Sequence, residues 1–271
     1  MTTPRLRWTA KPVTLGFRHL RASTNEHASA MLPWLPTSPV QFPSINQALD
    51  EPDGLLAAGG DLTPDWLIAA YRCGIFPWFS DDQPILWWSP SPRMVLFPGE
   101  IRIRRSLAKR LRNAGFKVTW NTAFPAVIEA CAATRSDDEG TWISDDMRKA
   151  YVALHSLGYA QSIEVWRDGS LVGGLYGVGM GRVFFGESMF SRVPDASKVA
   201  LVYLARHLQA LGGGLIDCQM HTSHLASMGA REIARQEFIN YLDLYIQGQD
   251  GIAPRMAAKA PEDDIISEGG R

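Results

Sequence analysis

The sequence predicts an α+β protein, in which a small N-terminal α+β domain precedes a larger second domain. Two observations support this class. Segments with helical periodicity alternate with short apolar runs, and the second half holds several consecutive strand-like segments separated by tight turns. The composition, 46% hydrophobic and 20% charged residues, is ordinary for a globular protein. We expect a boundary near residues 95–115, with the N-terminal domain over 41–100 and the second domain over 101–248.

Both ends of the chain are expected to lie outside these domains. Residues 1–40 mix Pro, Thr and Arg without periodicity, so we interpret them as a loose extension and a candidate for disorder. Residues 249–271 are predicted to form a disordered tail.

The first half of the chain contains clear helix boundaries. Pro64 follows Asp61-Leu-Thr and indicates the first turn of a helix, which Gly74 ends. Residues 75–98 are rich in Pro and Trp and are predicted to be irregular or to form short strands. Three more helices are expected, over residues 106–114, 126–133 and 144–158.

The second half predicts a meander of strands followed by a helix, a strand and a helix. Antiparallel strands are expected over 161–166, 171–178 and 182–190, with a turn at Arg167-Asp-Gly-Ser. A helix over 196–211, a glycine stop at 212–214, a strand over 215–219 and a helix over 236–246 complete the chain.

Two of these apolar strands each contain a carboxylate, Glu187 in one and Asp217 in the other. A carboxylate is costly to bury unless it is paired or hydrogen-bonded, so these two residues are candidates for chemistry. Gln219 lies two residues after Asp217, so both side chains are expected on one face of the strand. The carboxylate there accepts a proton or stabilises an ammonium group, and the carboxamide both donates and accepts hydrogen bonds. In the alternative interpretation, Asp217 only caps a neighbouring turn.

A local basic stretch stands out on a chain whose net charge is −1. It contains no acid, and its cations are Arg102, Arg104, Arg105, Lys109, Arg110 and Arg112. Such a stretch is often a solvated helix face, but the mutual repulsion of its cations favours a bound anion. A nucleic-acid backbone is the natural candidate, and binding through it weakens steeply with salt.

Several other classes of site are not indicated. The three cysteines lack Cys-x-x-Cys spacing, and His221 and His224 have no third ligand in register, so neither a disulfide framework nor a metal is expected. Gln209-Ala-Leu-Gly-Gly-Gly matches a coenzyme-A pyrophosphate motif, but these glycines are expected to end a helix, whereas anion binding needs them at a helix start. No apolar stretch is long enough to span a bilayer and no signal peptide is evident, so a cytoplasmic location is expected.

The motifs resemble those of one family, the leucyl/phenylalanyl-tRNA–protein transferases. The resemblance covers residues 42–242, and its blocks are F-P-S, G-L-L-A-A-G-G-D-L, G-I-F-P-W-F-S, I-L-W-W-S-P-S-P-R, E-G-T-W-I, S-I-E-V-W, L-V-G-G-L-Y-G, G-E-S-M-F-S, A-S-K-V-A-L and L-I-D-C-Q. It implies transfer of Leu or Phe, and less well Met, from charged tRNA to proteins with N-terminal Arg or Lys. The products are marked for N-degron degradation. It also implies a GNAT-like (acetyltransferase-like) second domain, no cofactor and no membrane partner, and a monomer is expected.

The resemblance also implies roles for particular residues. Asp217 and Gln219 are the expected catalytic pair, in which Asp217 polarises Gln219 beside the attacking amine. The remaining implied residues are Glu187, Trp78 and Trp142 for the aminoacyl-adenosine, Leu175, Phe184, Leu204 and Ile216 for an apolar side-chain pocket, and Arg105, Lys109 and Arg112 for tRNA phosphates. Many family members have Met and Phe where this chain has Leu175 and Leu204. The two tryptophans lie in loop contexts, where aromatic residues also commonly just cover a core.

Two alternatives remain. An aminoacyl-tRNA-dependent ligase that builds cell-wall peptide bridges shares a GNAT-like core, but such enzymes usually contain two copies of it and this chain has room for one. A non-catalytic tRNA-binding module has no need of carboxylates in strand cores. An assay with Leu-tRNA and a peptide beginning with Arg distinguishes the three.

Overall fold

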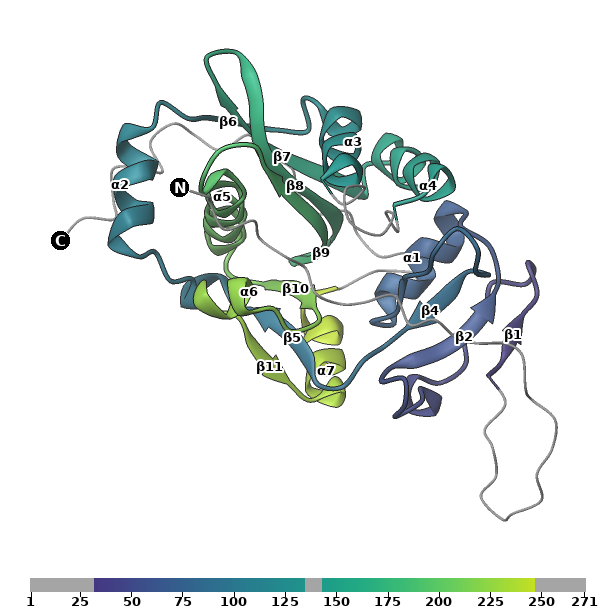
Figure 1. The fold of residues 1–271 in the computed structure, drawn as a ribbon. Helices are drawn as coiled ribbons and strands as arrows, with labels where there is room; N and C mark the ends of the chain where they lie inside the picture. Colours follow the sequence, from purple (N-terminus) through teal and green to yellow (C-terminus); the bar gives the residue numbers. More distant parts are fainter. Residues whose placement is uncertain (1–31, 135–142, 247–271) are drawn as a thin grey trace.

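The computed structural model describes residues 32–134 and 143–246, which form two sheets flanked by helices (Figure 1). The expected α+β class is confirmed. Within the described residues, no helix has both the length and the apolar character needed to cross a bilayer. The expected tail over 249–271 and Trp142 lie outside the described residues.

The N-terminal sheet has four short strands in the order β1-β2-β4-β3. Their bounds are Trp34–Leu35 (β1), Leu55–Gly59 (β2), Phe76–Pro77 (β3) and Leu86–Trp88 (β4). The strand β1 pairs with β2 in parallel, so residues 32–40 of the expected extension already contain sheet structure. Helix α1 (Pro64–Arg72) begins with proline at its first position, and Gly74 follows it at a φ of 72° that favours glycine.

The second sheet has seven strands in the order β11-β5-β10-β9-β8-β7-β6. Their bounds are Arg93–Leu96 (β5), Lys117–Trp120 (β6), Ala160–Arg167 (β7), Ser170–Met180 (β8), Val183–Ser191 (β9), Leu215–Gln219 (β10) and Arg231–Ile233 (β11). All neighbours are antiparallel except β9 and β10, which are parallel. The strand β5 lies before residue 100, the expected end of the N-terminal domain, yet it pairs within this larger sheet.

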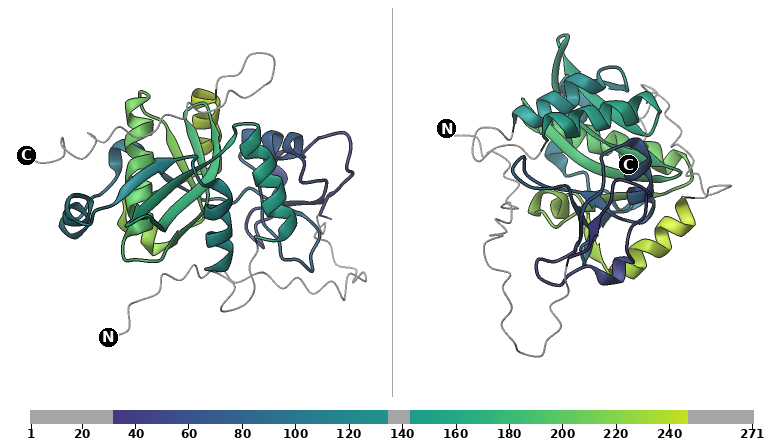
Figure 2. Two further views of the ribbon diagram at one scale, coloured as in Figure 1. Left: turned by 90° about the horizontal axis from the view of Figure 1, so that it is seen from above. Right: turned by 90° about the vertical axis from the view of Figure 1, so that its right-hand side faces the viewer.

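Helices cover both faces of the seven-stranded sheet (Figure 2). Their bounds are Arg105–Asn113 (α2), Phe124–Ala133 (α3), Asp145–Ser156 (α4), Ala196–Ala210 (α5), Ser223–Ser227 (α6) and Arg235–Tyr245 (α7), and short 3-10 turns lie at Ile45–Gln47 and Pro98–Glu100. Because side chains alternate along a strand, Leu175 of β8 packs into the core with α5, whereas Tyr176 packs into the core with α3 and α4. A Cβ at Gly173 would lie 2.4 Å from the Cβ of Ala196, so glycine permits the close approach of α5 to β8.

The expected helices and the three antiparallel strands are confirmed, with shifts of a few residues at their ends. The glycines Gly212 to Gly214 follow α5 and lead into β10, so they end a helix as expected. The strands β2, β6 and β11 and the helix α6 were not predicted. Each has five residues or fewer, and strand segments this short are formed by pairing with neighbours more than by their own propensity.

Candidate active site

Two adjacent strands at the centre of the large sheet, β9 and β10, are both irregular. Their parallel pairing joins Val183–Phe185 to Leu215–Asp217 and ends there. Just beyond it, the register between β8 and β9 shifts at Glu187, and the register between β10 and β5 shifts at Cys218. Bulges of this kind change the direction of side chains and are common next to active sites.

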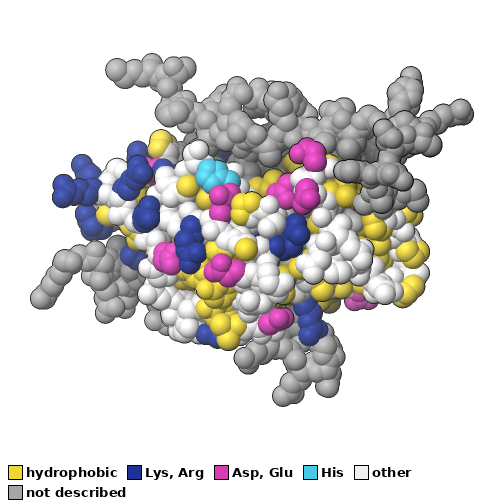
Figure 3. Space-filling view, turned by 90° about the horizontal axis from the view of Figure 1, so that it is seen from below, with side chains coloured by type: hydrophobic (Ala, Val, Ile, Leu, Met, Phe, Trp, Pro, Cys, Tyr) yellow, Lys and Arg dark blue, Asp and Glu magenta, His cyan; other side chains and the backbone are white. Residues whose placement is uncertain are grey.

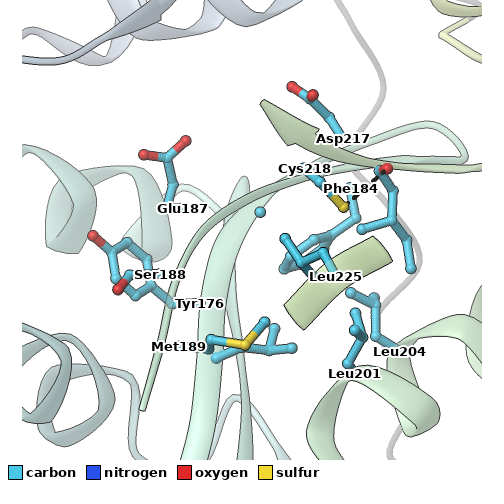
Figure 4. A pocket seen from close by; sticks show the side chains of 13 residues that line it. Tyr176, Phe184, Glu187, Ser188, Met189, Leu201, Leu204, Asp217, Cys218 and Leu225 are labelled. Atoms are coloured by element: carbon cyan, nitrogen blue, oxygen red, sulfur yellow. Dashed lines mark hydrogen bonds between the residues drawn. The ribbon is translucent and has the colours of Figure 1, made fainter. Parts of the chain in front are cut away.

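An apolar pocket opens where this pairing ends (Figure 4). Its empty volume is about 380 Å³, including the open mouth, and its wall includes Leu175, Phe184, Leu204 and Ile216, the four residues that the sequence analysis proposed as pocket residues. Glu187 and Asp217 are also among the lining residues, and in Figure 4 both carboxylates point away from the apolar side chains of Leu201 and Leu204. The structure therefore brings an apolar pocket together with both candidate acids.

Glu187 is the centre of a buried hydrogen-bond cluster drawn from four elements. The phenol of Tyr71 on α1 donates to Glu187 Oε1 at 2.7 Å, and the phenol of Tyr151 on α4 donates to Oε2 at 2.9 Å. The two phenol oxygens also contact each other. Gln219 Nε2 on β10 donates to Oε1 at 2.9 Å. The cluster therefore fixes both the carboxyl group and the carboxamide beside the pocket.

Burial changes the acidity of this cluster. Removal from water raises the pKa of Glu187 to about 7, and the charge of Asp217 also raises it. Hydrogen bonds from Tyr71 and Tyr151 and the charge of Arg93 act in the opposite direction on this pKa. The pKa values of both phenols are raised well above their usual range, chiefly by burial and then by the charge of Glu187. Glu187 is therefore the group of this cluster that titrates near neutral pH.

Asp217 lies in a different arrangement, a buried ion pair with Arg93 of β5. Arg93 Nε donates to Asp217 Oδ1 at 2.8 Å and Arg93 Nη2 donates to Oδ2 at 2.7 Å. The guanidinium also donates to the carbonyl of Gly74 and lies between the rings of Phe76 and Phe238. Both oxygens of Asp217 thus accept charge-assisted hydrogen bonds from one cation.

Asp217 contacts Gln219 through the backbone. The N–H of Gln219 donates to Asp217 Oδ1 at 2.9 Å, as in a turn capped by an aspartate, and Gln219 has a φ of 61°. This left-handed backbone is uncommon for a residue other than glycine and directs the carboxamide to Glu187. Ile216 and Cys218 pack into one core cluster, whereas Asp217 and Gln219 bond to Arg93 and Glu187, whose neighbours belong to the other, so the two side chains do lie on one face as expected. They contact each other through the backbone N–H of Gln219, and their side chains bond to different partners.

Trp78 and the three basic residues lie outside the pocket wall. Trp78 is half-buried against Trp88, with ring centroids 5.5 Å apart, and is not part of the pocket wall. Arg105, Lys109 and Arg112 are exposed on α2, where Lys and Arg side chains gather at one edge of the molecule (Figure 3). In the same stretch, Arg110 pairs with Asp195 at 3.0 Å, so this cation is balanced within the protein.

Sequence reasoning missed Arg93, Tyr71 and Tyr151. Glu187 was identified as a charged residue in an apolar strand, and the same criterion applies to Arg93. Arg93 is the first residue of the buried strand β5, and the three residues after it are apolar. The same signal selects Glu164, which is fully buried but accepts hydrogen bonds from two threonines, a serine and the N–H of Ala123 next to α3. Glu164 is not on the pocket wall, and we assign it a structural role.

No group of three metal-binding side chains was found among the described residues.

Family models match most of the described chain. The model for "Leucyl/phenylalanyl-tRNA protein transferase" matches residues 95–243, and the model for the N-terminal domain of the same family matches residues 60–91.

Among curated proteins, the chain is 71% identical over 216 residues to a leucyl/phenylalanyl-tRNA–protein transferase of Chromohalobacter salexigens, covering 80% of this chain and 84% of that protein. Proteins of the same name from Azoarcus sp. and Pseudomonas aeruginosa are 64% and 60% identical, over 77% and 79% of this chain and 88% and 95% of theirs. Among solved structures, a GCN5-related N-acetyltransferase from Kribbella flavida aligns with a TM-score of 0.33 and 12% identity, over 63% of this chain and 61% of that one.

Proposed function

The chain belongs to the leucyl/phenylalanyl-tRNA–protein transferase family, and on this premise we propose that it moves Leu or Phe, and less well Met, from charged tRNA to the N-terminal Arg or Lys of acceptor proteins. The products are thereby marked for N-degron degradation. The observation that carries this proposal is the apolar pocket whose wall includes Glu187 and Asp217, with Gln219 bonded to Glu187.

The pocket fits the proposed donors. Its wall consists largely of Leu, Phe, Ile and Met side chains, which favour an apolar guest and offer little to a charged one. The aminoacyl ester is already activated, so the main requirement is to hold an amine against the ester carbonyl. When the side chain of the donor amino acid occupies the pocket, its ester carbonyl is expected to lie next to Glu187 and Gln219.

Gln219 is suited to orient the attacking amine. Its Nε2 donates to Glu187, so its carbonyl oxygen is the end that remains to accept a hydrogen bond from the amine. A carboxamide is a very weak base, and its role is therefore orientation. In the same proposal Asp217 is a positioning residue, because it acts through the backbone N–H of Gln219 and is itself held by Arg93.

The tRNA is proposed to bind across α2 and the mouth of the pocket. Arg105, Lys109 and Arg112 are exposed on one short helix, where cations contact phosphates at little desolvation cost. We assign Trp78 and Trp142 to the terminal adenosine because of the family resemblance. The reaction is proposed to occur in the cytoplasm, with the enzyme acting as a monomer and without a cofactor.

The direct test is transfer itself. The full chain is incubated with radiolabelled Leu-tRNA or Phe-tRNA and a peptide beginning with Arg, and the product is sequenced. New Leu or Phe at the N-terminus is expected, and a peptide beginning with an acetylated Arg is the matched control that must stay unmodified. Failure to label the free peptide while the tRNA is bound would contradict the transferase assignment.

A further inference from the structure

Four oxygen atoms form a closed ring beside the pocket. They are the phenol oxygens of Tyr71 and Tyr151 and the two carboxyl oxygens of Glu187. Tyr71 lies 2.7 Å from Oε1 and Tyr151 lies 2.9 Å from Oε2, and the two phenol oxygens are in hydrogen-bond contact. All three side chains are buried, so these contacts are shielded from bulk solvent.

The ring contains three oxygen–oxygen contacts between residues, and each needs one proton. The two phenols supply two protons, because a phenol donates only once. The third proton has to be on the carboxyl group of Glu187. When Glu187 is ionised, both phenols donate to the carboxylate, and the contact between the two phenols then has no proton. The fully bonded ring is therefore the protonated state: the carboxylic acid donates to one phenol, that phenol to the other, and the second phenol to the remaining carboxyl oxygen.

We propose that Glu187 is the group that takes the proton from the α-ammonium of the acceptor protein, and that Tyr71 and Tyr151 are positioning residues that hold its carboxyl group in both protonation states. This deepens the proposed function and relies on it only for the identity of the ammonium group. Of the two acids that line the pocket, it assigns the proton to Glu187 and not to Asp217, whose oxygens both accept from the Arg93 cation.

The protons balance in two steps. First, an N–H bond of the ammonium breaks and an O–H bond forms on the Glu187 carboxylate, which leaves a neutral amine with a free electron pair. The amine then attacks the ester carbonyl, the bond from the carbonyl carbon to the ribose oxygen breaks, and the second proton of the amine passes to that ribose oxygen. Glu187 later releases its proton to solvent, which restores the carboxylate.

The charges around Glu187 are compatible with this role. Asp217 on β10 raises the pKa of Glu187 and Arg93 on β5 lowers it, and burial brings it to about 7, close to the value at which a general base is most effective. Burial raises the pKa of the Cys218 thiol well above its usual range, so that neighbour stays neutral. From β8, Tyr176 packs edge to face on Tyr151.

Infrared spectroscopy of the full chain without substrate tests the ring directly. About one pH unit below the pKa of Glu187, the wild-type protein is expected to show the carbonyl stretch of a buried carboxylic acid. The band should be missing in Glu187→Gln and shifted in Tyr71→Phe and Tyr151→Phe, because each phenol bonds one carboxyl oxygen. Tyr241→Phe removes a phenol that packs on Phe97 and Tyr245, and it should leave the band unchanged. A wild-type spectrum without this band overturns the proposal.

The pH profile of kcat/KM tests the catalytic role. The wild-type profile is expected to rise through one ionisation near 7 as well as that of the amine near 8. Glu187→Gln should lose the first ionisation and fall roughly 10²–10⁴-fold in rate. Tyr71→Phe and Tyr151→Phe should shift the first ionisation to higher pH, because the hydrogen bonds from both phenols lower the pKa of Glu187. Tyr241→Phe should leave this ionisation unchanged. An unchanged first ionisation in Glu187→Gln contradicts the base role.

The two assignments fail separately. Because the infrared measurement uses no substrate, a missing band removes the ring while leaving transfer intact. Absence of transfer to any Arg or Lys peptide removes the proposed function while leaving the protonated ring in place.

Discussion

Arg93 and Asp217 lie on neighbouring strands and form a two-bond ion pair with 1% and 0% of their side chains exposed. The guanidinium also reaches the carbonyl of Gly74 after α1, so one side chain connects the N-terminal elements to the strand that carries Gln219. A pair this deeply buried is a weak source of net stability, but its loss is costly, because the remaining charge has no partner.

Asp217→Ala should lose both stability and activity. The unpaired guanidinium of Arg93 is expected to lower the free energy of unfolding by about 3–5 kcal/mol, and release of the Gln219 N–H should abolish transfer. Denaturant unfolding and the transfer assay measure the two effects. Asp146→Ala breaks an exposed pair with Lys149 and should cost less than about 1 kcal/mol. Normal turnover in Asp217→Ala would contradict the positioning role of Asp217.

Gln219→Gly separates the backbone of this residue from its side chain. Glycine adopts the left-handed φ of 61° without steric cost, so the free energy of unfolding should change by about 1 kcal/mol or less. Turnover should nevertheless fall strongly, because no carboxamide orients the amine. Thermal unfolding and kcat are the measurements. Retained kcat in a folded variant would show that the side chain is dispensable.

The stability of the protein should depend on the ionisation of Glu187. Its pKa is raised from 4.5 to about 7 on folding, so between these values the folded state binds more protons than the unfolded state. The free energy of unfolding should therefore fall as pH rises through this window, by at most about 1.4 kcal/mol per pH unit from this group. Urea unfolding at several pH values should show this slope in the wild type and a flatter one in Glu187→Gln. Equal slopes would mean that Glu187 titrates normally.

Neutralising the exposed cations of α2 should weaken tRNA binding. Changing Arg105, Lys109 and Arg112 together to Gln is expected to raise the apparent Michaelis constant for charged tRNA. The slope of log affinity against log salt should fall by roughly 2. Lys149 and Arg231, which pair with Asp146 and Glu100, supply a control double variant. An unchanged salt slope in the triple variant removes the phosphate role.

Enlarging the pocket should change donor selection. Leu204→Ala is expected to cost about 2–5 kcal/mol of stability and to raise the rate with Phe-tRNA relative to Leu-tRNA, because the vacated space accepts the larger ring. Leu56→Ala makes a cavity in the N-terminal core, where Leu56 is fully buried, and should leave the ratio unchanged. If Leu204→Ala leaves the ratio as in the wild type, the pocket does not hold the donor side chain.

Local patterns predicted the longer elements because their signals are local. Pro64 before an apolar helix, Gly158 after α4 and the turn between β7 and β8 all act within a few residues. The strands β2, β6 and β11 were missed, since their stability comes from partners far along the chain.

The candidate residues Glu187, Asp217 and Gln219 were identifiable because a charged or polar group in an apolar strand is conspicuous in the sequence alone. Their connections were not identifiable. A regular strand places Asp217 and Gln219 on one face, as found, but strand periodicity cannot show that Asp217 pairs with Arg93 and that Gln219 bonds to Glu187.

The sequence by itself determined the fold class and the identity of the polar residues, because each is a property of residue type and short-range periodicity, and the resemblance to the family supplied the apolar pocket residues. Only the tertiary structure decided which groups meet. It joined Asp217 to Arg93 over 124 positions and Glu187 to Tyr71 over 116. The physical reason is that hydrogen bonds and burial act through distance in space, so the acidity and the role of a carboxyl group depend on neighbours that its own strand does not contain.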